Sequence, residues 1–173
     1  HCTISGFKAI HINNTGNESN IGLFGYTGTG FQVKNLNMST GVVAGWHQVG
    51  SLVGVNNGVI ENCHITNTDT GEVVGLFGGY CGGLVGINSG TITKSSFRGN
   101  VHGTVKVGGL VGGGGGIYDS FVTGSVTGYD TVGGFIGSLS SISSGQISNC
   151  YAAVELDYGG NSSAVVGGFA AQV

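Results

Sequence analysis

The chain of 173 residues has few charges, no proline and no long apolar run. Charged residues make up 8% of it, about a third of the usual ~25%. No window of roughly 18 apolar residues exists, because Gly, Ser, Asn and Thr interrupt every run, and we therefore expect no membrane span. A disordered chain is poor in β-branched and aromatic residues, whereas Val, Ile, Thr, Phe and Tyr recur here at intervals. We therefore expect one folded domain over residues 1–173.

The net charge is −3, so the chain carries no basic surface of the kind that nucleic acids bind, and we expect no nucleic-acid partner. The sequence opens at His1 rather than Met and shows no signal peptide, which is expected of a mature product or an excised segment.

Motifs for catalysis and metal binding are also missing. No C-x-x-C or H-x₃-H spacing suggests zinc, and no G-x-S-x-G, H-E-x-x-H or calcium-binding nonapeptide occurs. Arg98 is the only arginine, and the five histidines hold different repeat positions. We expect no enzymatic activity and no cofactor, because the carboxylates are scattered: Glu18, Glu61, Asp69, Glu72, Asp119, Asp130, Glu155 and Asp157.

Glycine is abundant, at 38 residues, and much of it lies in one repeated pattern. Five copies, Ile21–Gly25, Gly50–Gly54, Gly82–Gly86, Gly108–Gly112 and Gly133–Gly137, read much like Gly-Gly-Leu-Val-Gly, and Gly167–Ala171 is a degenerate sixth. A period of this length predicts a repeat architecture. We interpret the final glycines as structural residues at tight corners: Gly25, Gly54, Gly86, Gly112 and Gly137. The run Gly112–Gly116 is expected to be a flexible loop.

A second pattern follows each glycine motif, at intervals of 25 to 32 residues. It begins with an apolar residue, and we predict that these residues form one core ladder: Ile4, Val33, Ile60, Ile92, Ile117 and Ile147. Three residues further on stands the next inward position, which holds Phe7, Leu36, Cys63, Ser95, Ser120 or Cys150. Nine residues after the first position, four repeats place Val42, Val101, Val126 or Leu156.

The step of three predicts a bend, since inward residues of a straight strand fall at every second position. The residues between the two inward positions mostly tolerate a positive φ: Gly6, Asn35, Asn62, Lys94, Asp119 and Asn149. One repeat cannot bury its own apolar side, but stacked repeats can. We predict an all-β, right-handed parallel β-helix (β-solenoid) of about six coils. Insertions expected as projecting loops are 13–20, 71–82, 138–145 and 158–164.

The glycine pattern, followed by Ile-Glu-Asn-Cys-His at 60–64 and Ile-Ser-Asn-Cys-Tyr at 147–151, resembles the GLUG-motif repeat. That family occurs in large microbial surface and secreted proteins, among them adhesins and immunoglobulin A peptidases, as a non-catalytic spacer or adhesive module. The resemblance covers essentially the whole chain and implies an extracellular, right-handed parallel β-solenoid. The first repeat departs from the pattern because it lacks Asn-Cys, and the last ends in Ala-Ala.

Cysteines, aromatic residues and sequons leave several alternatives open. Cys63 and Cys150 share a ladder position three coils apart, roughly 14 Å, which is too far for a disulfide; a Cys2–Cys81 bridge stays open. Rings that could stack on sugars fall at outward or loop positions: Tyr26, Trp46, Tyr80, Tyr118, Tyr129, Tyr151 and Tyr158. Four N-x-S/T sequons make glycosylation possible at Asn13, Asn17, Asn37 and Asn161.

These features favour an extracellular structural or adhesive module, a stalk or a head-to-tail filament of a microbial cell surface. The alternative is a β-helix protein that binds or degrades polysaccharide. We expect the end coils to be covered by identical subunits or by neighbouring coils of the same parent chain, because bare strand edges invite pairing. Surface glycans are further possible partners.

Overall fold

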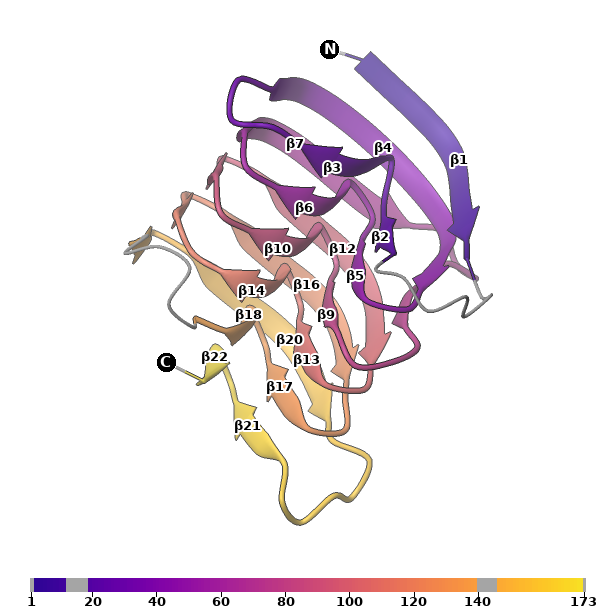
Figure 1. The fold of residues 1–173 in the computed structure, drawn as a ribbon, viewed down its shortest axis with the longest axis vertical. Helices are drawn as coiled ribbons and strands as arrows, with labels where there is room; N and C mark the ends of the chain where they lie inside the picture. The colour runs from indigo at the N-terminus through magenta and orange to yellow at the C-terminus, as the bar shows by residue number, and fades with distance from the viewer. Residues whose placement is uncertain (1, 12–18, 140–145, 173) are drawn as a thin grey trace.

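The computed structural model describes residues 2–11, 19–139 and 146–172, and these residues contain strands and no helix. Parallel strands stack into a β-solenoid of about five turns (Figure 1). The sequence predicted about six coils, and six is the number of strands found in each of the two short sheets of the described residues. A rung here means one circuit of the chain through all three sheets.

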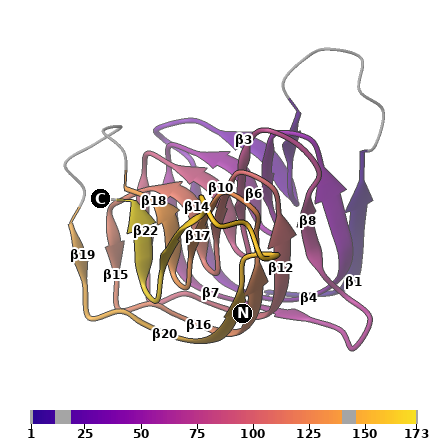
Figure 2. The ribbon, with the colours of Figure 1, turned by 90° about the horizontal axis from the view of Figure 1, so that it is seen from below.

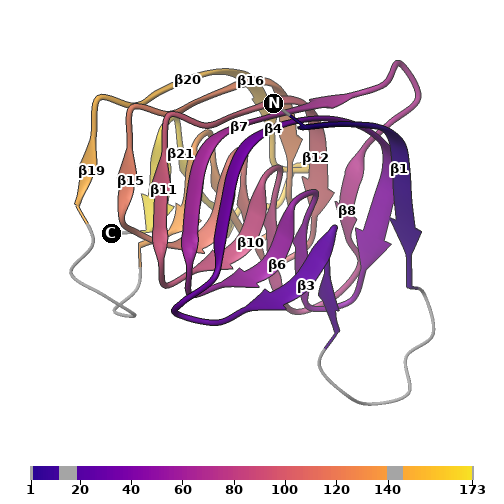
Figure 3. The same ribbon diagram turned by 90° about the horizontal axis from the view of Figure 1, so that it is seen from above.

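Three parallel sheets enclose the core, and we name them A, B and C. Sheet A curves round one side, and sheets B and C close the other, as seen from below and from above in Figures 2 and 3. Sheet A contains β1 (Cys2–Ile10), β4 (Gln32–Gly45), β7 (Val59–Asn67), β8 (Val73–Gly75), β11 (Thr91–Thr93), β12 (Ser96–Gly103), β15 (Ile117–Tyr118), β16 (Phe121–Thr127), β19 (Ile147–Ser148) and β20 (Tyr151–Asp157).

The two short sheets supply one strand each to every rung. Sheet B contains β2 (Asn20–Ile21), β5 (Gln48–Gly50), β9 (Tyr80–Gly82), β13 (Lys106–Gly108), β17 (Thr131–Gly133) and β21 (Val165–Gly167). Sheet C contains β3 (Phe24–Thr27), β6 (Val53–Asn56), β10 (Val85–Asn88), β14 (Val111–Gly114), β18 (Ile136–Ser138) and β22 (Ala170–Gln172).

The core ladder of sheet A is confirmed from the second rung onward. Val33, Ile60, Ile92, Ile117 and Ile147 pair with one another in this order. Ile60, Ile92 and Ile117 are fully buried, whereas Val33 and Ile147 lie in outer rungs and are partly buried.

Ile4 does not begin that ladder, so this prediction is wrong. Ile4 pairs with Met38, and the register of β1 shifts between Ile4 and Phe7. The step of three in β1 therefore comes from a bulge at Ser5–Gly6 and not from the corner that follows Val33. The same spacing arises from two different backbone irregularities, and sequence spacing alone does not separate them.

The predicted bend is confirmed, since each residue assigned to it has a positive φ. The values are 56° for Asn35, 54° for Asn62, 50° for Lys94, 50° for Asp119 and 54° for Asn149, and 68° for Gly6 in its bulge. The prediction that Val42 occupies the inward position nine residues after Val33 is wrong. Val43, one residue later, pairs with Val73 and is fully buried, because β4 contains one extra residue.

The five glycines assigned to corners lie inside the strands of sheet C, so their placement at corners is wrong: Gly25, Gly54, Gly86, Gly112 and Gly137. A Cβ added to Gly112 would lie 2.7 Å from the Cys81 nitrogen and 2.7 Å from the Gly86 oxygen. Glycine is needed because the backbones of sheets B and C approach closely there. The corner itself falls earlier in the motif, at pairs such as Gly83–Leu84 between β9 and β10.

The glycine run 112–116 is not a flexible loop. All five glycines are buried, and β14 includes the first three of them. The ring of Tyr80 lies on one side of Gly113, and a Cβ there would come within 2.5 Å of it. Gly114 and Gly116 have φ values of 114° and 72°, which other residues rarely adopt.

The predicted insertions agree with the structure only in part. Residues 158–164 form a loop between β20 and β21, as expected. Residues 71–82 do not project, because β8 and β9 lie within them; the extra residues are mainly 68–72. Asn20 belongs to β2 and Ser138 to β18, and positions 13–18 and 140–145 fall outside the described residues.

Candidate functional site

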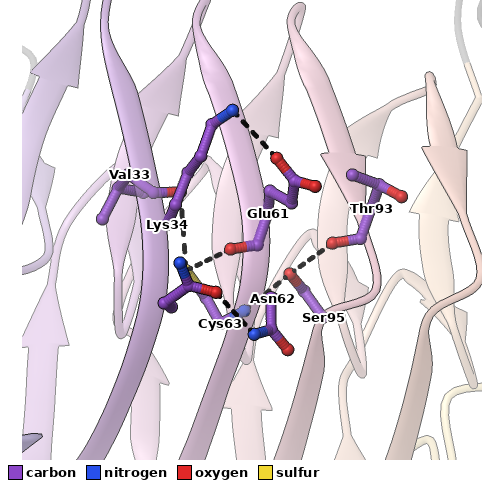
Figure 4. Close-up of polar contacts among 8 residues, drawn as sticks. Val33, Lys34, Glu61, Asn62, Cys63, Thr93 and Ser95 are labelled. Carbon is purple, nitrogen blue, oxygen red and sulfur yellow. Dashed lines mark hydrogen bonds and ion pairs between the residues drawn. The ribbon is translucent and has the colours of Figure 1, made fainter. Parts of the chain in front are cut away.

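The outer corner of sheet A carries a polar ladder on residues with positive φ (Figure 4). The Asn62 amide donates to Asn35 Oδ1 at 2.7 Å, and Lys34 Nζ lies 2.9 Å from Glu61 Oε2. The hydrogen bond from Lys34 and its charge hold the pKa of Glu61 below its usual value. Glu61 is therefore ionised near neutral pH and is a poor general acid.

Inside the same corner, serine hydroxyls and cysteine thiols form hydrogen bonds with backbone amide and carbonyl groups. Ser95 Oγ accepts from the Cys63 amide at 3.1 Å and donates to the Thr93 carbonyl at 2.9 Å (Figure 4). Ser120 repeats this arrangement one rung later, with the Ser95 amide and the Tyr118 carbonyl. The repeated Cys and Ser side chains thus fix the bend and do not form a reactive group.

None of the four cysteines forms a disulfide, although Cys63 and Cys81 belong to the same rung, on β7 and β9. Cys81 is fully buried between the Val73 and His102 carbonyls, and burial raises the pKa of its thiol to about 12. Burial also raises the pKa of Cys63 and Cys150. A protonated, buried thiol is a weak nucleophile, so these three cysteines are unsuited to catalysis.

His64 makes the one contact between a serine hydroxyl and a histidine ring that is found among the described residues. Its Nδ1 lies 2.9 Å from Ser96 Oγ, and its Nε2 lies 3.1 Å from Asn62 Oδ1. Sequence reasoning missed this group because it compared the histidines only with one another, whereas His64 and Ser96 are register partners on the neighbouring strands β7 and β12, and Asn62 also lies on β7. Ser96 is 7% exposed, which leaves its hydroxyl little room to reach a substrate. The group is best described as part of the outward polar rows of sheet A.

A hollow of about 310 Å³ opens beside His64, on the outer surface of sheet A near β1. The hollow lies beside the bulge of β1, and most of its lining is polar: Thr3, Ser5, Asn37, Ser39, His64 and Thr66, together with Ile4 and Met38. Hydroxyl, amide and imidazole groups of this kind hydrogen-bond to sugars or other polar ligands.

The carboxylates predicted to be scattered do not form a cluster in the part of the chain that the structure describes. No group of three or more His, Cys, Asp or Glu residues there could hold a metal ion. Asp119 accepts from Asn149 at 3.0 Å on the corner, and the Asp157 carboxylate accepts from the Gly159 amide at 3.0 Å. Glu18 lies outside the described residues.

The outward aromatic rings form separate groups and not one groove. Phe121 and Tyr151 stack on sheet A with centroids 5.1 Å apart, and Trp46 stacks on Phe77 at the corner between sheets A and B. On sheet B, Lys106 Nζ donates to the Tyr80 hydroxyl at 2.8 Å. Tyr118 is half-buried beside the corner, and Tyr26, Tyr129, Tyr151 and Tyr158 are exposed.

A buried amide ladder, which sequence reasoning missed, runs inside the corner between sheets C and A. Thr27 Oγ1 donates to Asn56 Oδ1 at 2.7 Å, Asn56 donates to Asn88 Oδ1 at 2.7 Å, and Asn88 donates to the Gly115 carbonyl. All three side chains are almost fully buried. The available signal was the Asn that stands two residues after the glycine motif in two repeats, at 56 and 88.

The asparagine side chains of the described sequons differ in their exposure and in their hydrogen bonds. Asn37 is exposed on sheet A, at the edge of the hollow beside His64. The Asn161 amide donates to the Tyr129 carbonyl at 2.6 Å, and its oxygen accepts from the Ser163 amide, so this side chain shapes its loop. Asn13 and Asn17 lie outside the described residues.

The last rung leaves the core open, and a hollow of about 420 Å³ lies there between sheets A and C. Its lining is largely apolar: Leu139, Ile147, Ser148, Asn149, Cys150, Phe169 and Ala170. Phe169 stacks on the fully buried Phe135 of the rung before it, at 4.6 Å, and is itself only partly buried.

Comparison with known proteins gives no match: no family model, no curated protein and no solved structure is similar to this chain. Within the described residues, no helix is long and apolar enough to cross a membrane.

Proposed function

We propose that this chain is a non-catalytic structural or adhesive module of an extracellular stalk or head-to-tail filament. The observation that carries the proposal is the continuity of the core columns up to the last rung. There Val165 and Val166 are 49% and 41% exposed, whereas Val132, one rung earlier, is fully buried. A surface of this kind is suited to receive a further rung of the same type.

The resemblance to GLUG-motif repeats supports an extracellular, cell-surface location, and the exposed sequon at Asn37 is compatible with it. The scattered carboxylates and the ionised Glu61 support a role without catalysis, since glycoside hydrolysis needs two carboxylates placed across one bond.

Sedimentation velocity of the purified chain over a range of concentrations tests the proposal. A module that stacks should show a sedimentation coefficient that rises with concentration, and electron microscopy should show rods of constant width. A folded monomer that persists at high concentration would contradict the filament. Turnover of a uronate polysaccharide by the purified chain would contradict the absence of catalysis.

The second candidate is a polysaccharide-binding β-helix protein. The polar hollow beside His64 and the stacked Phe121–Tyr151 pair favour it, because both present sugar-compatible groups on sheet A. A glycan array with the unmodified chain and with Tyr151→Ala tests this role. Binding that Tyr151→Ala weakens, with Tyr26→Ala as the matched exposed control, would favour the binding protein.

A further inference from the structure

The last described rung presents inward side chains and a free strand edge at each of its three faces. β20, β21 and β22 each pair with one earlier strand, on β16, β17 and β18. Their outer edges therefore carry unpaired amide and carbonyl groups, which form a template for another parallel strand.

The first rung holds residues in the same columns as the last, and in three of these columns a large residue in one rung corresponds to a small residue in the other. Following the pairing from rung to rung, Ile4 shares a column with Ala152, and Phe24 shares one with Ala170. Ala9 shares a column with Leu156, again small against large. Large against small residues at facing positions allow two layers to interdigitate.

The outward charges of the two rungs are complementary too. Lys8 immediately precedes Ala9, and Glu155 immediately precedes Leu156, so the two charged residues lie beside the same inward column in their respective rungs. Both side chains are exposed. A lysine on the first rung and a glutamate on the last would face each other if the two rungs were neighbours.

Two cysteines of the end rungs, Cys2 and Cys150, also share one column. Cys2 pairs with Leu36, which pairs with Cys63, and Cys150 occupies this column in the last rung. Cys2 is exposed and Cys150 is half-buried at the open end. Neighbouring parallel strands lie about 4.8 Å apart, within the Cα separation of roughly 4.4–6.8 Å that a disulfide spans.

We propose that the last rung of one copy receives the first rung of a second copy in continuous register, with Lys8 facing Glu155 and Cys2 facing Cys150. This rests on the proposed stacking function and specifies which residues meet. The contact is head-to-tail and does not close on itself, so repetition produces a filament.

Charge exchange tests the register through the dissociation constant from sedimentation equilibrium. Lys8→Glu and Glu155→Lys should each weaken association about tenfold, since an attraction becomes a repulsion. The double variant restores an opposite pair and should return the constant to within about threefold of the original. Arg98→Glu makes the same change in net charge as Lys8→Glu, but in a central rung, and should leave association unchanged.

Mixed crosslinking tests the same contact without altering charge. Cys2→Ser retains Cys150, and Cys150→Ser retains Cys2, so only a mixture of the two contains both partners of the contact. Diamide is the oxidant: each thiol loses a proton and an electron, the S–S bond forms, and the N=N bond of diamide is reduced to the hydrazine. Mass-tagged copies should give a disulfide-linked dimer of one variant with the other.

The outcomes separate this register from the broader proposal. Assembly without a mixed crosslink and without rescue by the double variant would overturn the register but leave the stacking module. A crosslinked dimer in the Cys2→Ser sample alone would show tail-to-tail contact and overturn the head-to-tail arrangement. A chain that stays folded and monomeric in every sample would overturn both.

Discussion

The central rungs and the last rung have the same inward columns, but they differ in how far neighbouring rungs bury the side chains of those columns. Ile117, Phe135 and Val132 are completely buried, because a rung lies on each side of them. In the last rung, the equivalent residues Ile147 and Phe169 are only partly buried, and Val166 is 41% exposed. Stability in this fold therefore depends on how many rungs touch a residue and not only on its identity.

The largest expected difference concerns the isoleucine ladder. Ile117→Ala should lower the free energy of unfolding by about 2–5 kcal/mol, through lost burial and the cavity left between two rungs. Ile147→Ala should cost about 1–2 kcal/mol, because the native side chain is already partly exposed. Urea denaturation of both variants measures the contrast, and equal costs would contradict an uncovered last rung.

The amide ladders provide the next contrast. Asn88→Ala removes a buried donor to Gly115 and an acceptor for Asn56, and it should cost about 2–3 kcal/mol. Asn149→Gly removes an exposed amide on the last rung but tolerates the φ of 54°, so a change below about 0.5 kcal/mol is expected. Thermal unfolding followed by circular dichroism compares them. A large cost at Asn149 would mean that the outer ladder, too, determines stability.

The corner glycines test how closely consecutive rungs approach. A Cβ at Gly134 would lie 2.0 Å from the Gly168 oxygen in the next rung, whereas a Cβ at Gly168 would meet nothing within 4 Å. Gly134→Ala should therefore cost about 1–3 kcal/mol, and Gly168→Ala should be neutral or stabilise slightly. Chemical denaturation of both variants measures the two changes in the free energy of unfolding. If head-to-tail stacking covers the last rung, Gly168→Ala should also weaken association.

The smallest effect at neutral pH concerns the thiols. Burial raises the pKa of Cys81 from 9.0 to about 12, so the folded state keeps a proton that the unfolded chain loses first. The free energy of unfolding should then fall by about 1.4 kcal/mol per pH unit as pH rises from about 9 towards 12. Cys81→Ala should reduce that slope, and Cys150→Ala on the last rung should reduce it less. Denaturation curves between pH 8 and roughly 10.5 give the comparison.

Much of the architecture could be predicted from the sequence because each repeat has to solve one local problem. The positive φ at Asn35, Asn62 and Asp119 follows from residues that tolerate it, placed between two inward positions. The isoleucine ladder follows from the alternation of a strand. Where two local irregularities share a spacing, as at Ile4, or one residue is inserted, as before Val43, the prediction fails.

The candidate surfaces were less predictable than the core. The contact of His64 with Ser96 joins the same repeat position in two neighbouring rungs, 32 residues apart, where the two rungs carry different side chains. The polar hollow beside His64 lies next to a bulge in β1 that changes the local register. Such features depend on which side chains meet across neighbouring rungs and on local changes of register, and the repeat pattern encodes neither.

The sequence by itself determined the repeat, the bend in each rung and the apolar columns, because these depend on short-range spacing and on the conformations that Gly, Asn and Asp allow. Tertiary structure decided where the glycines act, since the need for Gly112 arises only when the backbone of sheet B lies 2.7 Å from the place of its Cβ. It also decided which columns continue to the open end. Lys8 and Glu155 are far apart in sequence, and only the pairing from rung to rung places their neighbours, Ala9 and Leu156, in one column.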